Sequence, residues 1–69
     1  MSILKVVEVL AESSGGWEDA AKQAVNEAAR SLRHIRSIYI ENFQATVQNG
    51  RIDKYRVNAK ITFAVEDDS

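Results

Sequence analysis

The sequence contains no cysteine and no proline, and its only histidine is His34. The absence of cysteine excludes a disulfide framework and any thiolate metal site, and one histidine excludes a multi-histidine metal site within the chain. A chain of 69 residues makes one domain, residues 1–69, and buries only about 60% of the surface that its unfolded form exposes. Small domains usually add disulfides, a metal or oligomerisation. Oligomerisation is the stabilising device that remains, so we expect a homo-oligomer.

An excess of either charge is also missing, because 9 basic residues face 10 acidic ones and the net charge is −1. This balance gives no broad attraction to nucleic acid or to an anionic membrane. The apolar N-terminal segment is too short to span a bilayer and is interrupted by Lys5 and Glu8. No basic residues precede it, as they would in a signal peptide. We therefore expect a cytoplasmic protein with neither a nucleic-acid nor a membrane partner.

The first half of the chain predicts a strand followed by a helix. Residues Ile3–Leu10 are rich in isoleucine, valine and leucine and indicate a strand, and Glu12–Gly16 supplies serines that suit a helix cap and glycines that turn the chain. The apolar residues that follow are spaced by three and four, as in an amphipathic helix: Trp17, Ala20, Ala21, Ala24, Val25, Ala28 and Leu32. We expect Arg30 and Arg33 in the last turn of this helix, where they would suit its dipole.

The second half predicts a β-hairpin. Two strands, Ile35–Gln48 and Arg51–Glu66, flank Asn49-Gly50, the strongest short hairpin signal. A two-residue turn places Gln48 opposite Arg51 and determines the earlier pairs, which are Ile38 with Ile61, Ile40 with Ala59, and Asn42 with Val57. We assign this face, continued by Tyr55, Phe63 and Val65, to the helix.

The other face of the hairpin combines Tyr39, Phe43, Val47 and Ile52 with polar side chains. One helix cannot cover both faces of a sheet. A mixed face of this kind is typical of a subunit interface or a pocket wall. The alternative is a solvated face with scattered aromatic side chains.

Taken together, these segments make the chain resemble the dodecins. The resemblance rests on four segments in the same order and spacing: LKVVEVLAESS, SSGGWEDAA, SLRHIRSI and KYRVNAKITF. It implies an α+β fold of βαββ order, with a three-stranded antiparallel sheet partly wrapped round one helix. It further implies twelve subunits closed into a hollow shell that binds flavins near threefold axes, for storage or buffering and not for catalysis.

Two positions depart from the flavin-binding pattern of that family. A tryptophan that stacks on the flavin early in the second strand is replaced by Ser37, and a glutamine in a Tyr-Gln-Val triplet is replaced by Arg56. Serine offers no aromatic surface, and arginine is charged and only donates hydrogen bonds. We expect both residues on the face away from the helix and flavin binding to be weak or lost, with Tyr39 as the first substitute aromatic.

Other candidate residues have a plain structural interpretation beside a functional one. The position of Trp17 in the apolar stripe of the helix fits an anchor in the core or in an interface better than a tryptophan that stacks on a flavin. His34 fits a helix-end cap or a surface residue better than an acid or base. The cluster that it forms with Arg30, Arg33 and Arg36 could bind a phosphate group, but a solvated helix end explains it as well.

The acidic residues suggest an ion pair and a cation site. Arg56 lies one diagonal cross-strand step from Glu41, which favours a salt bridge between subunits over an anion-binding role. Glu41 and the acids of Glu66–Asp68 could bind calcium at a symmetry axis, although their spacing does not make a calcium loop. The sequence assigns no metal ligand.

Three functions follow from these observations. The first is a dodecin-like shell that stores or buffers a small, flavin-type ligand. The second is a structural or ion-binding shell, for example for calcium, whose flavin pockets are closed by Arg56. The third is an enzyme, which the sequence disfavours because it has no nucleophile–base pair, metal motif or phosphate loop.

Overall fold

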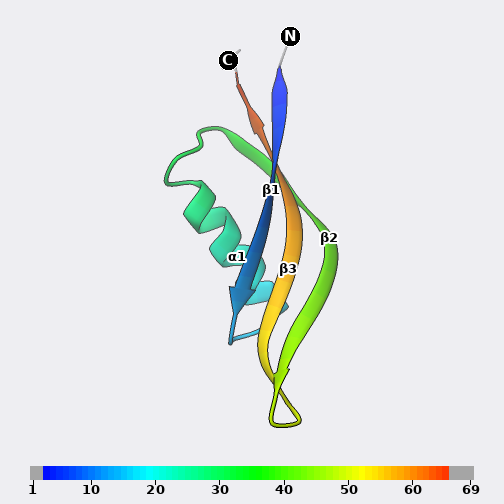
Figure 1. Cartoon of the computed structure of the whole chain (residues 1–69). Helices are drawn as coiled ribbons and strands as arrows, with labels where there is room; N and C mark the ends of the chain where they lie inside the picture. Colours follow the sequence, from blue (N-terminus) through cyan, green and yellow to red (C-terminus); the bar gives the residue numbers. More distant parts are fainter. Residues whose placement is uncertain (1–2, 66–69) are drawn as a thin grey trace.

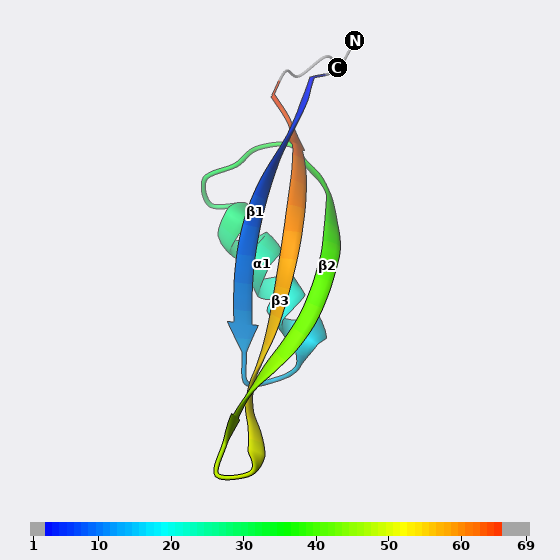
Figure 2. The same cartoon turned by 45° about the vertical axis from the view of Figure 1, so that its right-hand side comes forward.

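The computed structural model describes residues 3–65, in the order β1 (Leu4–Ser13), α1 (Trp17–Ala28), β2 (Ile35–Gln48) and β3 (Arg51–Ala64). The strands form one antiparallel sheet in the order β1-β3-β2, so the last strand is the central one. The long, twisted sheet curves past α1, which lies against one of its faces (Figures 1 and 2). The expected α+β fold of βαββ order is confirmed.

The core lies between α1 and the central strand. Val57, Ala59 and Ile61 point from β3 toward the helix and are completely buried, as is Ala20 of α1. Ala24 is buried beside them, which confirms the apolar stripe expected for the helix. Four of these side chains are no larger than valine, and a core of this size supports the expectation that assembly stabilises the chain.

The ends of the elements differ from the prediction. β1 continues past Leu10 to Ser13, and α1 ends at Ala28. The backbone N–H groups of Arg30 and Ser31 bond to carbonyls only three residues earlier, which tightens the chain after the helix and ends it. Arg30 therefore follows the helix and does not complement its last turn, and the same correction applies to Arg33.

The expected serine cap at the start of α1 is also wrong. The N-cap is Gly16, whose φ of 130° favours glycine, and no side chain caps the helix there. Ser13 is buried and ties the turn together instead. Its hydroxyl accepts a hydrogen bond from the backbone N–H of Gly15 (2.9 Å) and donates one to the carboxylate of Asp19.

The Ser13 hydroxyl lowers the pKa of Asp19, and the amide of Gln23, 2.7 Å away, adds to the effect. Because the folded pKa is depressed, the carboxylate stabilises the fold above its unfolded pKa, and this contribution is lost as pH falls through the folded value. Ser13→Ala should therefore raise the pKa of Asp19 and weaken this acid dependence, as NMR titration of the carboxyl carbon would show. The exposed neighbour provides the control Ser14→Ala. An unchanged Asp19 pKa in Ser13→Ala would contradict the assignment.

The hairpin turn has the expected conformation, with positive φ at Asn49 (54°) and Gly50 (74°). The expected pair Gln48–Arg51 is confirmed. Two predicted pairs far from the turn, Ile38–Ile61 and Ile40–Ala59, are also confirmed.

The register between those points is shifted by one residue. Irregularities between Thr46 and Val47 and between Ile40 and Asn42 cancel each other and displace the segment between them, and a third irregularity lies between Ile35 and Ser37. Val57 there faces Phe43, and the expected pair of Asn42 with Val57 is wrong. Bulges of this kind add twist to a ribbon. Their consequence is that Phe43 lies on the helix side of the sheet and not on the far side, as predicted.

Trp17 packs against this displaced segment of β2. Its ring meets those of Phe43 and Tyr55 edge-on, with centroids 5.8 and 4.8 Å away. Its indole N–H donates to the backbone carbonyl of Gln44 at 2.9 Å. Trp17 therefore fastens the start of α1 to β2 and β3, which confirms the prediction of an anchor.

Candidate functional site

The face of the sheet turned away from α1, called the open face below, is the candidate site. No other element of residues 3–65 lies over it (Figures 1 and 2). Because side chains alternate along a strand, the central strand presents every second residue to this face: Lys54, Arg56, Asn58, Lys60 and Thr62. β1 adds Leu4, Val6, Glu8, Leu10 and Glu12. The open face thus has a basic centre with acidic and apolar residues on the β1 side.

Arg56 forms the best-defined ion pair of this face. It lies between Glu12 of β1 and Gln44 of β2 in one row across the sheet. Its Nε is 2.8 Å from Oε1 of Glu12, and the two side chains are 36% and 38% exposed. This hydrogen bond lowers the pKa of Glu12, and the charges of Arg56 and Lys54 add to the effect. Such a half-exposed pair contributes little stability, but it holds the guanidinium in place.

Arg56 does not pair with Glu41 within one chain, and the expected salt bridge between Arg56 and Glu41 of two subunits stays a prediction. The partner of Arg56 is Glu12 of the same chain, and Glu41 lies 3.9 Å from Lys60. The sequence analysis missed Glu12 as a partner because the hairpin register alone says nothing about β1. The pairing of β1 with the central strand places Glu12 directly opposite Arg56.

The sequence analysis also missed the amide side chain of Gln44 beside this pair. Gln44 donates from Nε2 to Oδ1 of Asn58 at 3.4 Å. Gln44 lies on the open face only because of the shifted register in the middle of β2. No local sequence signal marks that shift. The surroundings of Arg56 are therefore polar and already partly hydrogen-bonded.

The predicted site residues share the open face but do not come together. Ser37 lies opposite Thr62, and Tyr39 lies opposite Lys60 and is 63% exposed. Arg56 is six residues from Thr62 along β3, which is roughly 20 Å at about 3.3 Å per residue. One chain therefore cannot place Ser37 and Arg56 on the same small ligand. A pocket that uses both must combine two subunits.

The remaining candidates form no compact site in the part of the chain that the structure describes. Arg30 pairs with Glu27 at 3.4 Å on the surface, and His34 is exposed with a φ of 60°. His34 is thus a surface residue, and its carbonyl accepts a bond from Ala64. Between residues 3 and 65, no three histidine or acidic side chains are grouped to hold a metal ion. The acids of residues 66–68 lie outside the described residues.

Comparison with known proteins identifies the architecture. The sequence model described as Dodecin matches residues 3–66. The chain belongs to the dodecin family. It is 36% identical over 64 residues to calcium dodecin of Mycobacterium tuberculosis, covering 91% of this chain and 89% of the relative.

Solved dodecin structures have the same fold. An arginine-to-alanine variant of the Thermus thermophilus dodecin matches with a TM-score of 0.91 and 27% identity, covering 97% of this chain and 98% of the other. The calcium dodecin of Mycobacterium tuberculosis, described as having a novel calcium-binding site, matches with a TM-score of 0.82 and 29% identity over 99% and 97% of the two chains. Among residues 3–65 of this dodecin, no helix has the length and apolar character needed to cross a membrane.

Proposed function

We propose that this dodecin is a closed, hollow homo-oligomer of twelve subunits that stores or buffers a small ligand and catalyses no reaction. The observation that carries the proposal is the open face. It exposes Leu4, Val6, Leu10 and Tyr39, all at least 52% accessible, on a chain with very little core. Contact with further copies would bury these side chains and stabilise a domain that is otherwise marginal.

The charges of the open face support binding over catalysis. Arg56 is bonded to Glu12, and Lys60 lies near Glu41. The Arg56 guanidinium and the Glu12 carboxylate bind each other, whereas an acid or base catalyst must be free to exchange a proton with its substrate. A protein of this design, made of residues 1–69 as one domain and located in the cytoplasm, would act by sequestering its ligand.

The proposed ligand site lies between subunits. Ser37 and Tyr39 of one subunit would line one part of it, and Arg56 of a neighbour the other, because the two parts are too far apart within one chain. A flavin-type ligand would bind weakly there. Ser37 offers no ring for stacking, and Arg56 is occupied by Glu12.

A second function is favoured by two observations. The bonded Arg56–Glu12 pair fills the polar end of the proposed site, and the curated relative is named for calcium. Calcium prefers six to eight oxygen ligands, roughly, and no such group exists among residues 3–65 of one chain. In this alternative, carboxylates of several subunits would bind calcium inside a shell with closed flavin pockets.

Light scattering tests the assembly, and calorimetry separates the two ligands. We expect a single species with twelve times the 7.7 kDa mass of the chain. A folded monomer that persists at micromolar concentration would refute the proposal. On the assembled protein, heat on addition of riboflavin but not calcium supports the first function, and the reverse result supports the second.

A further inference from the structure

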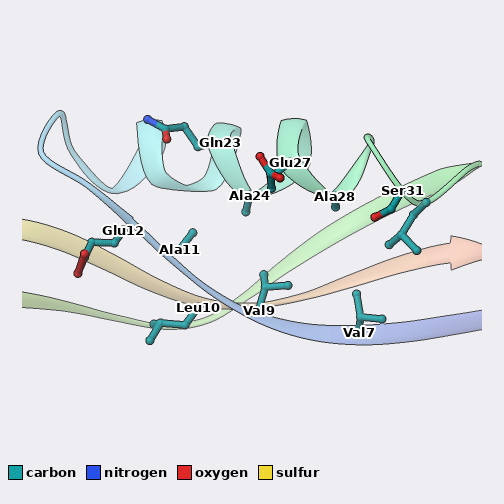
Figure 3. A pocket seen from close by; sticks show the side chains of 11 residues that line it. Val7, Val9, Leu10, Ala11, Glu12, Gln23, Ala24, Glu27, Ala28 and Ser31 are labelled. Atoms are coloured by element: carbon teal, nitrogen blue, oxygen red, sulfur yellow. The ribbon is translucent and has the colours of Figure 1, made fainter.

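A groove runs between β1 and α1 on the helix side of the sheet (Figure 3). Val7, Val9 and Ala11 point from the strand toward the helix, which faces them with Ala24 and Ala28. Alanine side chains are too short to fill the space between the two elements. β1 is moreover an edge strand, so no further strand among residues 3–65 closes the groove from that side. Its apolar floor is therefore open.

The hairpin tip, residues 46–54, projects from the same chain and carries two exposed apolar side chains. β1 ends at Ser13, opposite Tyr55, and only β2 and β3 continue to the turn (Figures 1 and 2). Val47 and Ile52 lie opposite each other on this ribbon and are 69% and 52% exposed. A ribbon of two strands is marginally stable by itself. Val47 and Ile52 together thus form one apolar knob on the tip, and the rest of the chain that the structure describes leaves this knob uncovered.

We propose that the hairpin tip of one subunit seats in the β1–α1 groove of the next. The inference rests on the homo-oligomer proposed above and specifies which surfaces of two copies meet. The knob of Val47 and Ile52 packs against the apolar floor of the groove. This contact removes from water the apolar surface of both partners, which is the main driving force of association.

The lengths of the two surfaces agree with this pairing. The groove extends along β1 from residue 7 to residue 12, roughly 16 Å, and the tip from residue 54 to residue 51, roughly 10 Å. The groove is long enough to receive it.

The occupant must come from another copy. The tip continues beyond the start of α1, near Trp17, while the groove extends toward Ala28 and Leu32 at the other end of the helix (Figure 1). Since the tip and the groove are different surfaces, the contact is head-to-tail and repeats from subunit to subunit. Such contacts close into rings when the rotation fits. Rings of this kind are compatible with a closed shell that has threefold axes.

The absence of cysteine makes a cross-linking test clean. Val47→Cys places a thiol on the tip, and Ala28→Cys places one in the groove. Disulfides need Cα atoms about 4.4–6.8 Å apart, so the two positions of one chain cannot join. After oxidation of the assembled double variant, we expect most of the protein in covalent multimers on a denaturing gel, and their loss on reduction. The matched control joins Val47→Cys to Asn26→Cys, on the other side of α1, and should stay monomeric on the gel.

A second pair, Ile52→Cys with Val9→Cys, serves if the first disturbs assembly. An assembled variant of either pair that forms no disulfide overturns the tip-in-groove contact but leaves the proposed function intact. Disulfide dimers of Val47→Cys alone also overturn it, because they would show that tips meet each other. A monomeric wild-type protein in light scattering refutes the proposed function itself and this contact with it.

Discussion

Replacement of Ile61 by alanine should lower the free energy of unfolding by about 2–5 kcal/mol and leave little folded protein at ambient temperature. Ile61 is completely buried at the centre of the sheet, opposite Val7 of β1 and Ile38 of β2. The substitution leaves a cavity between three strands and a helix. Domains of ordinary size have a free energy of unfolding of about 5–15 kcal/mol, and a chain with this small core is less stable than that. Urea unfolding followed by circular dichroism measures the change.

The control for this experiment is Ile3→Ala, the same chemical change at a side chain that is 48% exposed. Surface changes of this kind alter stability by about 0.5 kcal/mol. Both variants are compared with wild type at one subunit concentration, because assembly stabilises the folded state by mass action. If Ile61→Ala lowers the free energy of unfolding no more than Ile3→Ala does, Ile61 does not lie in the core.

The double variant Ser37→Trp with Arg56→Gln should bind riboflavin more tightly than either single variant or the wild type. An indole at position 37 adds a stacking surface worth about 0.5–1.5 kcal/mol, and an amide at position 56 can donate and accept at the polar edge of the ring. Ser37→Trp alone leaves the charged arginine at the polar edge of the flavin, and Arg56→Gln alone leaves the ring without a stacking surface. A double-mutant cycle should therefore show an interaction energy above the additive scatter of about 0.5 kcal/mol.

The structure sharpens this prediction in two ways. The two positions lie roughly 20 Å apart on one chain, so their coupling requires a pocket shared by two subunits. Arg56→Gln also leaves Glu12 without its partner, and the pKa of Glu12 should then rise toward its ordinary value. Adding Glu12→Gln to the double variant removes this stranded carboxylate and provides the matched control.

Fluorescence quenching of riboflavin measures binding, after light scattering has shown that each variant is assembled. A fully assembled double variant without quenching would show that the open face is not the ligand site. Nanomolar binding by the wild type would contradict the expectation from Ser37 and Arg56. In that case Tyr39, exposed on the same face, is the next residue to replace.

Much of the fold could be predicted because its signals are local. The three- and four-residue spacing after Trp17 identified the helix, and Asn49-Gly50 identified the hairpin and its register next to the turn. The scarcity of other stabilising devices pointed to assembly, and the order of four segments pointed to the family. Ser37 and Arg56 were recognised as departures from the flavin-binding pattern for the same reason, since residue identity at a matched position needs no coordinates.

The sequence by itself determined the order and type of the elements and the turn, because each depends on neighbours along the chain. Only the tertiary structure decided which residues meet across strands. Paired irregularities moved Phe43 beneath Trp17, and the pairing of β1 gave Glu12 rather than Glu41 to Arg56. The register of a strand depends on packing over the whole sheet, and a one-residue shift reverses the faces of its side chains. The same long-range pairing separates Ser37 from Arg56 on one face.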